Sequence, residues 1–292
     1  MKLFDFLKQG KLKPTWRYAA SGAIWRVFPT ESGKLVGEER DLLLKHTSFF
    51  CLNQMTGEVL WEKLSLQEPW WIGVEAIHRD VIFFHRFATP DLPEHRSIIA
   101  VDLLSGAILW SNEELKFILS IEDTVYGSKE SVEGQLLFEL EYRSGALLRS
   151  WGNNQQIIKD AKALSVSRLE DQIEFPAPVN TLQEETLAAT SIRSLITKGN
   201  LVGSIEAIEY GDVVIFNYHE TTPQSTEEQL QVNNILKVAE KSTGGVVFSE
   251  VLNSGAATVA PESFFVQQGT LYYIKDRTVL TAVRMSVADS VS

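Results

Sequence analysis

The chain of 292 residues contains a single cysteine, Cys51. One cysteine cannot form an internal disulfide and is too few for a thiolate metal site, so a disulfide scaffold and a zinc ribbon are excluded. Long apolar runs are also absent: no window of about 18 apolar residues occurs, and we expect no membrane-spanning helix. Hydrophobic residues still make up 44% of the chain, which is too apolar for a disordered protein and enough for a sizeable core.

Basic residues are scarce relative to acidic ones, with 27 Lys and Arg against 38 Asp and Glu and a net charge of −11. This balance argues against a general nucleic-acid binder, because such binding rests on cationic contacts to phosphate. The N-terminal segment has no apolar region of secretory type, since Asp5 and several lysines interrupt it, and we expect a cytoplasmic protein. Residues 3–7 are compatible with a short membrane-surface helix or with a segment docked on the domain.

One turn pattern recurs four times along the chain. A strand leads to Asp, Asn or Glu, then two residues, then Thr or Ser followed by Gly, then a second strand. Gly supplies the positive φ of a tight turn, the upstream polar side chain can bond the turn backbone, and the large fourth residue after Gly is placed to pack on a neighbouring unit. The glycines are Gly57, Gly106, Gly145 and Gly244, and the large residues are Trp61, Trp110, Arg149 and Phe248.

The spacing of these glycines is 49, 39 and 99 residues, which fits units of roughly 40–50 residues with one unit missing or altered. Upstream of three turns lies a second block, an Asp-centred turn followed by an apolar strand that ends in histidine. These blocks are Asp41–His46, Asp80–His85 and Asp212–His219. Each unit is therefore expected to have four strands, A to D, with the Asp turn between A and B and the Gly turn between C and D.

The segment from Ala100 to Trp110 resembles the tryptophan-docking signature of PQQ-type β-propellers, and the segment from Cys51 to Trp61 matches it with Asn53 in the Asp position. The chain also resembles small uncharacterised bacterial proteins built on shortened propellers of this type, for which the resemblance implies no activity. The resemblance covers roughly residues 25–150 and 204–286, and the two later copies lack the tryptophan.

The fold class predicted from these repeats is all-β: one propeller domain, residues 1–292, with about five to six four-stranded blades. A partly helical insertion is expected near 155–200, where residues 181–184 are typical of a capping box and apolar residues up to Ile196 have helical spacing. The expected repeat units are 25–64, 70–113, 116–152, a weak or inserted unit at 153–203, 204–252 and 260–286.

In such blades the B–C and D–A connections share one face, and the longer connections fall there: residues 88–96, residues 220–229 and the segment around Trp70 and Trp71. Binding residues tend to sit on loops held by a rigid scaffold, so we expect the functional site on this loop face. The candidate ligand- or partner-binding residues are Trp70, Trp71, His85, Arg86 and His219.

Each candidate has two interpretations. His46, His85 and His219 either converge as metal ligands or proton-transfer groups, or each bonds its own loop, and the second interpretation is favoured because the repeat itself places them. His78 and His95 add no recognisable metal spacing, and no metal is expected. Trp70 and Trp71 are either a stacking platform for a sugar or peptide, or packing residues between blades.

Enzyme signatures are few. The chain has no P-loop, no G-x-S-x-G and no H-E-x-x-H, and Glu75, Asp80, Glu206 and Asp212 are carboxylate candidates only because they recur. PQQ-dependent activity is not expected of this chain, and no cofactor is expected. The favoured function is a non-catalytic binding or scaffold module with a protein or peptide partner, expected to be a monomer. The alternative is an enzyme or binder of a carbohydrate-like ligand in a central channel.

Overall fold

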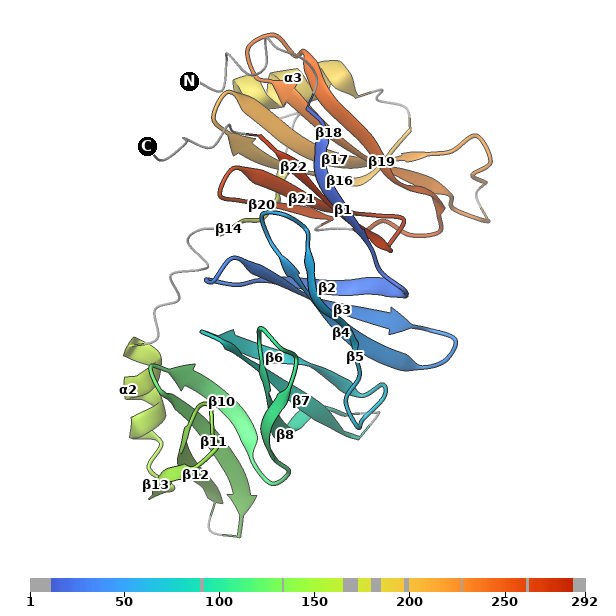
Figure 1. Cartoon of the computed structure of the whole chain (residues 1–292). Helices are drawn as coiled ribbons and strands as arrows, with labels where there is room; N and C mark the ends of the chain where they lie inside the picture. Colours follow the sequence, from blue (N-terminus) through green and yellow to red (C-terminus); the bar gives the residue numbers. More distant parts are fainter. Residues whose placement is uncertain are drawn as a thin grey trace. The chain divides into compact units, whose positions relative to one another are not determined.

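The computed structural model in Figure 1 describes residues 12–89, 92–132, 134–164, 173–179, 185–196, 200–226, 228–260 and 263–285. The chain divides into two compact units: a middle unit, Gly22–Leu169, and a terminal unit formed by Met1–Ser21 and Glu170–Ser292. Neither helix in the described part of the chain has the length and apolar character needed to cross a membrane. Residues 3–7 and 181–184, for which the sequence predicts a surface or docked segment and a capping box, lie outside the described residues.

The middle unit contains three four-stranded antiparallel sheets, each with its strands in chain order (Figure 1). The first sheet is β2 (Ala23–Pro29), β3 (Lys34–Asp41), β4 (His46–Asn53) and β5 (Val59–Leu64). The second is β6 (Ile72–His78), β7 (Val81–Thr89), β8 (Leu92–Asp102) and β9 (Ile108–Asn112). The third is β10 (Lys116–Ile121), β11 (Thr124–Ser131), β12 (Gly134–Glu141) and β13 (Leu147–Gly152), followed by helix α2 (Gln156–Leu164).

The terminal unit contains two five-stranded antiparallel sheets and helix α3 (Leu187–Leu195). One sheet has the order β15 (Ala177–Val179), β16 (Leu201–Tyr210), β17 (Val213–Thr221), β18 (Val232–Glu240) and β19 (Val246–Ala256). The other has the order β1 (Pro14–Ala19), β22 (Val279–Arg284), β21 (Thr270–Lys275), β20 (Phe264–Gln267) and β14 (Ile173–Glu174). The first strand of the chain thus pairs with the last.

Alternation of side chains along each strand lets a sheet pack on both faces. On β7, Ile82 and Phe84 join Phe49 in the core between the first and second sheets, whereas Val81 and Phe83 join a core shared with the third sheet. All five side chains are fully buried, and such burial contributes roughly 1.5–3 kcal/mol per large apolar side chain. The predicted mostly β fold with four-stranded sheets is confirmed.

The recurring Gly turns have the geometry that the sequence predicts. Gly57, Gly106, Gly145 and Gly244 have φ between 68° and 72°. The carboxylate of Asp102 accepts hydrogen bonds from the backbone N–H groups of Leu104 and Ser105, at 3.2 and 2.9 Å. Asn53 and Glu141 bond the backbone of their turns in the same way, whereas Glu240 accepts from the hydroxyl of Thr243.

The tryptophans that follow two of these turns dock on the next sheet, as the sequence predicts. The indole N–H of Trp61 donates to the carbonyl of Leu103 at 2.8 Å, and that of Trp110 donates to the carbonyl of Tyr142 at 3.0 Å. A Cβ at Gly145 would lie 2.6 Å from the ring of Trp110, so only glycine leaves room for the docked indole. The third sheet has Arg149 at this position and has no further sheet on its other face in the middle unit.

The described residues of 153–200 include helices α2 and α3 and the short strands β14 and β15, which join the sheets of the terminal unit. Helix α2 packs Ile158 and Ala161 against Leu119 and Leu137 of the third sheet, and α3 packs against the sheet that contains β16 and β17. The side chain of Thr186 caps α3 by accepting from the N–H of Ala189 at 3.0 Å. Each helix thus packs on a sheet, which agrees with the expected partly helical insertion.

Two local expectations are wrong. Residues after Asp41 do not form an apolar strand ending in His46, because the chain turns at 42–45 and His46 begins β4. Asp41 therefore lies between the second and third strands of its sheet, not between the first and second. Residues 88–96 are not a long loop either, since β7 and β8 continue as paired strands as far as Thr89 and Leu92.

Candidate functional site

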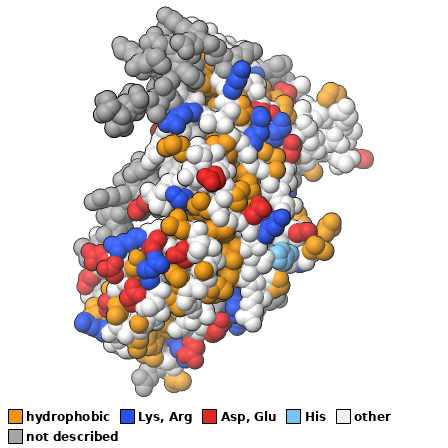
Figure 2. Space-filling view, in the orientation of Figure 1, with side chains coloured by type: hydrophobic (Ala, Val, Ile, Leu, Met, Phe, Trp, Pro, Cys, Tyr) orange, Lys and Arg blue, Asp and Glu red, His pale blue; other side chains and the backbone are white. Residues whose placement is uncertain are grey.

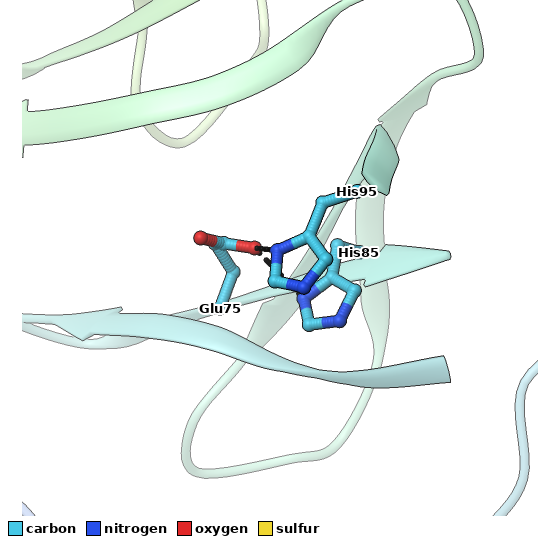
Figure 3. Close-up of side chains that lie close together, drawn as sticks. All are labelled: Glu75, His85 and His95. Carbon is cyan, nitrogen blue, oxygen red and sulfur yellow. Dashed lines mark hydrogen bonds and ion pairs between the residues drawn. The ribbon is translucent and has the colours of Figure 1, made fainter. Parts of the chain in front are cut away.

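Three ionisable side chains from consecutive strands of the second sheet meet at one point (Figure 3). They are Glu75 on β6, His85 on β7 and His95 on β8. The register of β6 against β7 shifts between Val74 and Ala76, so Glu75 occupies a β-bulge. Bulges redirect a side chain and are over-represented beside functional sites. We call these three residues the Glu–His–His cluster.

A second irregularity brings His95 into the cluster. The register of β7 against β8 shifts between Phe84 and Arg86, and Ser97 on the facing strand has a positive φ of 58°. Beyond this shift Phe87 pairs with His95, which places the His95 ring beside that of His85. The two imidazoles stack in parallel, with centroids 3.5 Å apart and an interplanar angle of 7°.

One carboxylate oxygen faces both rings. Oε2 of Glu75 lies 2.7 Å from Nδ1 of His95, a hydrogen bond, and 2.8 Å from Nδ1 of His85. The second contact is an ion pair, whereas Nε2 of His85 is buried and has no hydrogen-bond partner. Burial alone would raise the pKa of Glu75, but its interactions with His85 and then His95 outweigh burial and hold that pKa below its usual value.

The exposure of the three side chains differs. The side chain of His85 is only 5% exposed, whereas those of Glu75 and His95 are 22% and 42% exposed. The ring of Phe87 meets both imidazoles edge-on, with centroid distances of 5.0 and 5.2 Å. The cluster therefore has a fixed, desolvated member in His85 and two members that solvent reaches.

The backbone at Gly73 borders the buried side of His85. A Cβ added there would stand 3.4 Å from Nε2 of His85 and 3.8 Å from a carboxylate oxygen of Glu38. Glu38 is itself buried and forms an ion pair with Arg40 at 2.6 Å. The glycine thus leaves space between the free edge of the imidazole and a buried carboxylate.

Ring contacts lead from the cluster to the surface of the middle unit. Trp71 meets Phe87 edge-on at 6.2 Å and Trp70 at 6.4 Å. The guanidinium of Arg40 and the amine of Lys45 lie over the Trp70 ring at 4.9 and 4.8 Å, in the range of cation–π attraction. Trp70 is partly buried beneath these cations, and Trp71 is 37% exposed.

The remaining predicted site residues lie in different surroundings. Arg86 forms an ion pair with Glu113 at 2.7 Å and donates to the side chain of Gln67. His219 belongs to the terminal unit, where its Nε2 accepts the backbone N–H of Ala260 at 3.0 Å, and burial lowers its pKa. Their role as site residues remains a prediction.

The three histidines singled out by the repeat have separate environments. His46 lies within 3.1 Å of the Ser65 hydroxyl, and His219 accepts the backbone N–H of Ala260, which lies 41 residues further along the chain. His85 instead meets Glu75 and His95. The sequence signal for His95 was absent because residues 88–96 are typical of a loop, and a bulge at Glu75 leaves no mark in the residue pattern.

The carboxylate and two imidazoles form a set that can bind a cation or exchange a proton. Fold and site together define an antiparallel multi-sheet β protein with a Glu–His–His cluster in which only His85 is buried. A family described as a domain of unknown function (DUF4905) matches residues 29–110, which include all three cluster residues, Glu75, His85 and His95. The match spans less than a third of the chain. No curated protein matches the sequence.

Two solved structures show a distant likeness. The structure titled "Bifunctional GH43-CE Bacteroides eggerthii" has 11% identity and a TM-score of 0.25, and the match covers 93% of this chain and 34% of that one. "Structure of Dos1 propeller" has 8% identity and a TM-score of 0.29, with coverages of 90% and 67%. The chain thus spans about a third of the first structure's length and two thirds of the second's. Scores this low carry no argument about function.

Proposed function

We propose that the protein is a non-catalytic binding module that engages a protein or peptide partner through an apolar surface on the middle unit. The surface, here called the Leu–Trp surface, comprises Leu42, Leu43 and Leu44 in the turn between β3 and β4, Trp25 on β2, and Trp71 before β6. The observation that carries this proposal is the exposure of the three consecutive leucines, at 45%, 94% and 78%.

Polar residues are the usual occupants of such a turn, and exposed leucines leave apolar area in water at a cost of roughly 25 cal/mol per Å². Trp25 and Trp71 add large, partly exposed rings, at 49% and 37%. Arg40 lies between Trp25 and Trp71. Its guanidinium lies over the Trp25 ring and over the Trp70 ring, and Trp70 in turn contacts Trp71. Figure 2 shows hydrophobic and charged side chains side by side on one face of the molecule.

The leucine turn is held in one shape before any partner binds. The carboxylate of Asp41 accepts the backbone N–H groups of Leu43 and Leu44, both at 2.9 Å. Lys45 closes the turn with a positive φ of 52°. A preorganised turn favours binding, because little conformational entropy is lost when the partner docks.

The wider architecture supports the same proposal. We infer that the five sheets are blades of one propeller-type domain of residues 1–292, of the PQQ-like kind, in a monomeric cytoplasmic protein. The docked tryptophans, the packing of the second sheet on both faces and the pairing of β1 with β22 support this inference. On this arrangement the Leu–Trp surface belongs to the loop face. Small-angle scattering tests the architecture, since a compact disc and two separate units give different distance distributions.

The binding proposal is tested by Leu43→Asp, with Leu104→Asp as the matched control. Leu104 is also an exposed leucine in a turn of the middle unit, at 58%, but it lies in a Gly turn away from the Leu–Trp surface. We expect Leu43→Asp to lose a protein captured from cell extract by the wild type and Leu104→Asp to retain it. Equal capture by the three proteins contradicts the proposal. If the wild type forms a dimer and Leu43→Asp is a monomer, the partner is a second copy of this chain and not another protein.

A further inference from the structure

We propose that Glu75, His85 and His95 form a binding site for one first-row divalent transition cation, with Zn²⁺ as the reference ion. One ligand atom from each residue lies within 4.8 Å of the other two. Two imidazole nitrogens and a carboxylate oxygen are a ligand set that zinc and other first-row ions accept, often with a fourth position left for water or a bound molecule. The spacing in the sequence predicts no metal site, because the three residues meet only through two bulges.

Binding of an ion requires rearrangement of the two solvent-accessible members of the cluster, Glu75 and His95. Ligands of one tetrahedral ion at about 2.1 Å stand about 3.4 Å from each other. Glu75 Oε2 is nearer than this, at 2.7 and 2.8 Å from the two Nδ1 atoms, and the stacked imidazoles direct their in-plane lone pairs side by side. One ion therefore requires a turn of the His95 ring and withdrawal of the Glu75 side chain by about 0.6 Å.

The buried imidazole of His85 is the second observation that indicates a ligand. Its Nε2 is buried without a partner, which costs roughly 1–3 kcal/mol, and its buried Nδ1 contacts only Glu75 Oε2, at 2.8 Å. Coordination through one nitrogen removes part of that cost. Phe87 against the edges of both imidazoles excludes water from one side and fixes their orientation.

The site has a path to solvent and a place for a further ligand. The side chains of His95 and Glu75 are 42% and 22% exposed, so an ion reaches the cluster without opening of the core. A metal site requires such a path as well as ligands of suitable type and distance. The alternative is a cluster held only by a proton shared between Glu75 and the imidazoles, which would bind no Zn²⁺.

The experiment is calorimetric titration of ZnCl₂ into the full-length, tag-free protein after treatment with EDTA, with Co²⁺ absorption as a second readout. We expect one ion per chain with a Kd below about 1 μM and the visible bands of tetrahedral Co²⁺. Absence of binding by the wild-type protein overturns the proposal and identifies the cluster as proton-bridged.

The decisive variant is His95→Asn, because this side chain is exposed enough for the substitution to preserve the fold. Loss of one of three protein ligands is expected to weaken Zn²⁺ binding by at least about 100-fold. His46→Asn, an exposed histidine of the same unit outside the cluster, is the control and should bind as the wild type does. Equal affinity of His95→Asn and the wild type overturns the proposal.

Glu75→Gln provides a third arm, since it retains the size of the side chain and its ability to bond an imidazole while removing the charge. We expect it to weaken Zn²⁺ binding as His95→Asn does, and unchanged binding would contradict a carboxylate ligand. Leu43→Asp should bind Zn²⁺ normally. A failure of the Leu–Trp surface and a failure of the metal site are therefore distinguishable.

Discussion

His85 and His219 end two sequence blocks that look alike, and the structure gives them opposite environments. The block in the middle unit starts Glu75-Ala-Ile and the block in the terminal unit starts Glu206-Ala-Ile, and each reaches histidine after an Asp turn. His219 has its Nε2 satisfied by the Ala260 N–H, whereas Nε2 of His85 is buried without a partner and its Nδ1 faces the Glu75 carboxylate. Recurrence in the sequence therefore does not identify equivalent sites.

The number of residues after the turn explains the difference. His85 follows Asp80 by five residues, while His219 follows Asp212 by seven. As a result His85 pairs with Gly73, close to the bulged Glu75, but His219 pairs with Val202 and it is Asn217 that stands opposite Glu206. Two additional residues move the histidine away from the carboxylate of its own sheet.

The single cysteine lies in the middle unit, so its reactivity reports the opening of that unit alone. Cys51 is fully buried in the core between the first two sheets, and burial raises its pKa to about 12. We expect its reaction with a thiol reagent at pH 8 to be slower than that of the unfolded chain by at least about 10³-fold, because the thiolate forms only on opening. Rapid labelling of the native protein, measured against a urea-unfolded control, would contradict this.

Replacement of each histidine by phenylalanine compares the two environments directly. His219→Phe should destabilise the terminal unit by about 1–2 kcal/mol, since the N–H of Ala260 loses its acceptor. His85→Phe in EDTA should change the stability of the middle unit by less than about 1 kcal/mol, since removal of the unsatisfied Nε2 offsets the loss of the contact between Nδ1 and Glu75. Urea-dependent hydrogen exchange resolves the two units. Equal losses would show that the two histidines are equivalent after all.

Acidification should affect the terminal unit through His219. Burial lowers its pKa in the folded protein, so folding favours the neutral imidazole and the stabilisation is complete above the usual pKa of 6.5. It is lost as the pH falls below 6.5, by at most about 1.4 kcal/mol per pH unit. His219→Gln should flatten this part of the stability profile, and a profile identical to that of the wild type would exclude His219 as its source.

The smallest effect concerns the space beside His85. In Gly73→Ala the new Cβ would stand 3.3 Å from Cε1 of His85, which requires a displacement of a few tenths of an ångström. We expect a loss of stability of about 1 kcal/mol and a several-fold weakening of Zn²⁺ binding. Denaturation and titration of this variant check both values, and unchanged binding would show that the ring position tolerates movement.

Features set by local chemistry were predictable from the sequence. The turn at Gly106, the role of Asp102 within it and the docking of Trp61 and Trp110 all follow from short patterns. The bulges at Glu75 and Ser97 were not predictable, because strand register depends on pairing with a neighbour. The leucines after Asp41 have the composition of a buried strand, and only the structure shows that they form an exposed turn.

The most direct test of the Glu–His–His cluster is an anomalous difference map at the zinc absorption edge, from crystals of the protein grown with Zn²⁺. We predict a peak at about 2.0–2.2 Å from an imidazole nitrogen of His85, an imidazole nitrogen of His95 and a carboxylate oxygen of Glu75. A map without that peak, in which Glu75 Oε2 still contacts both Nδ1 atoms, would contradict the proposed metal site.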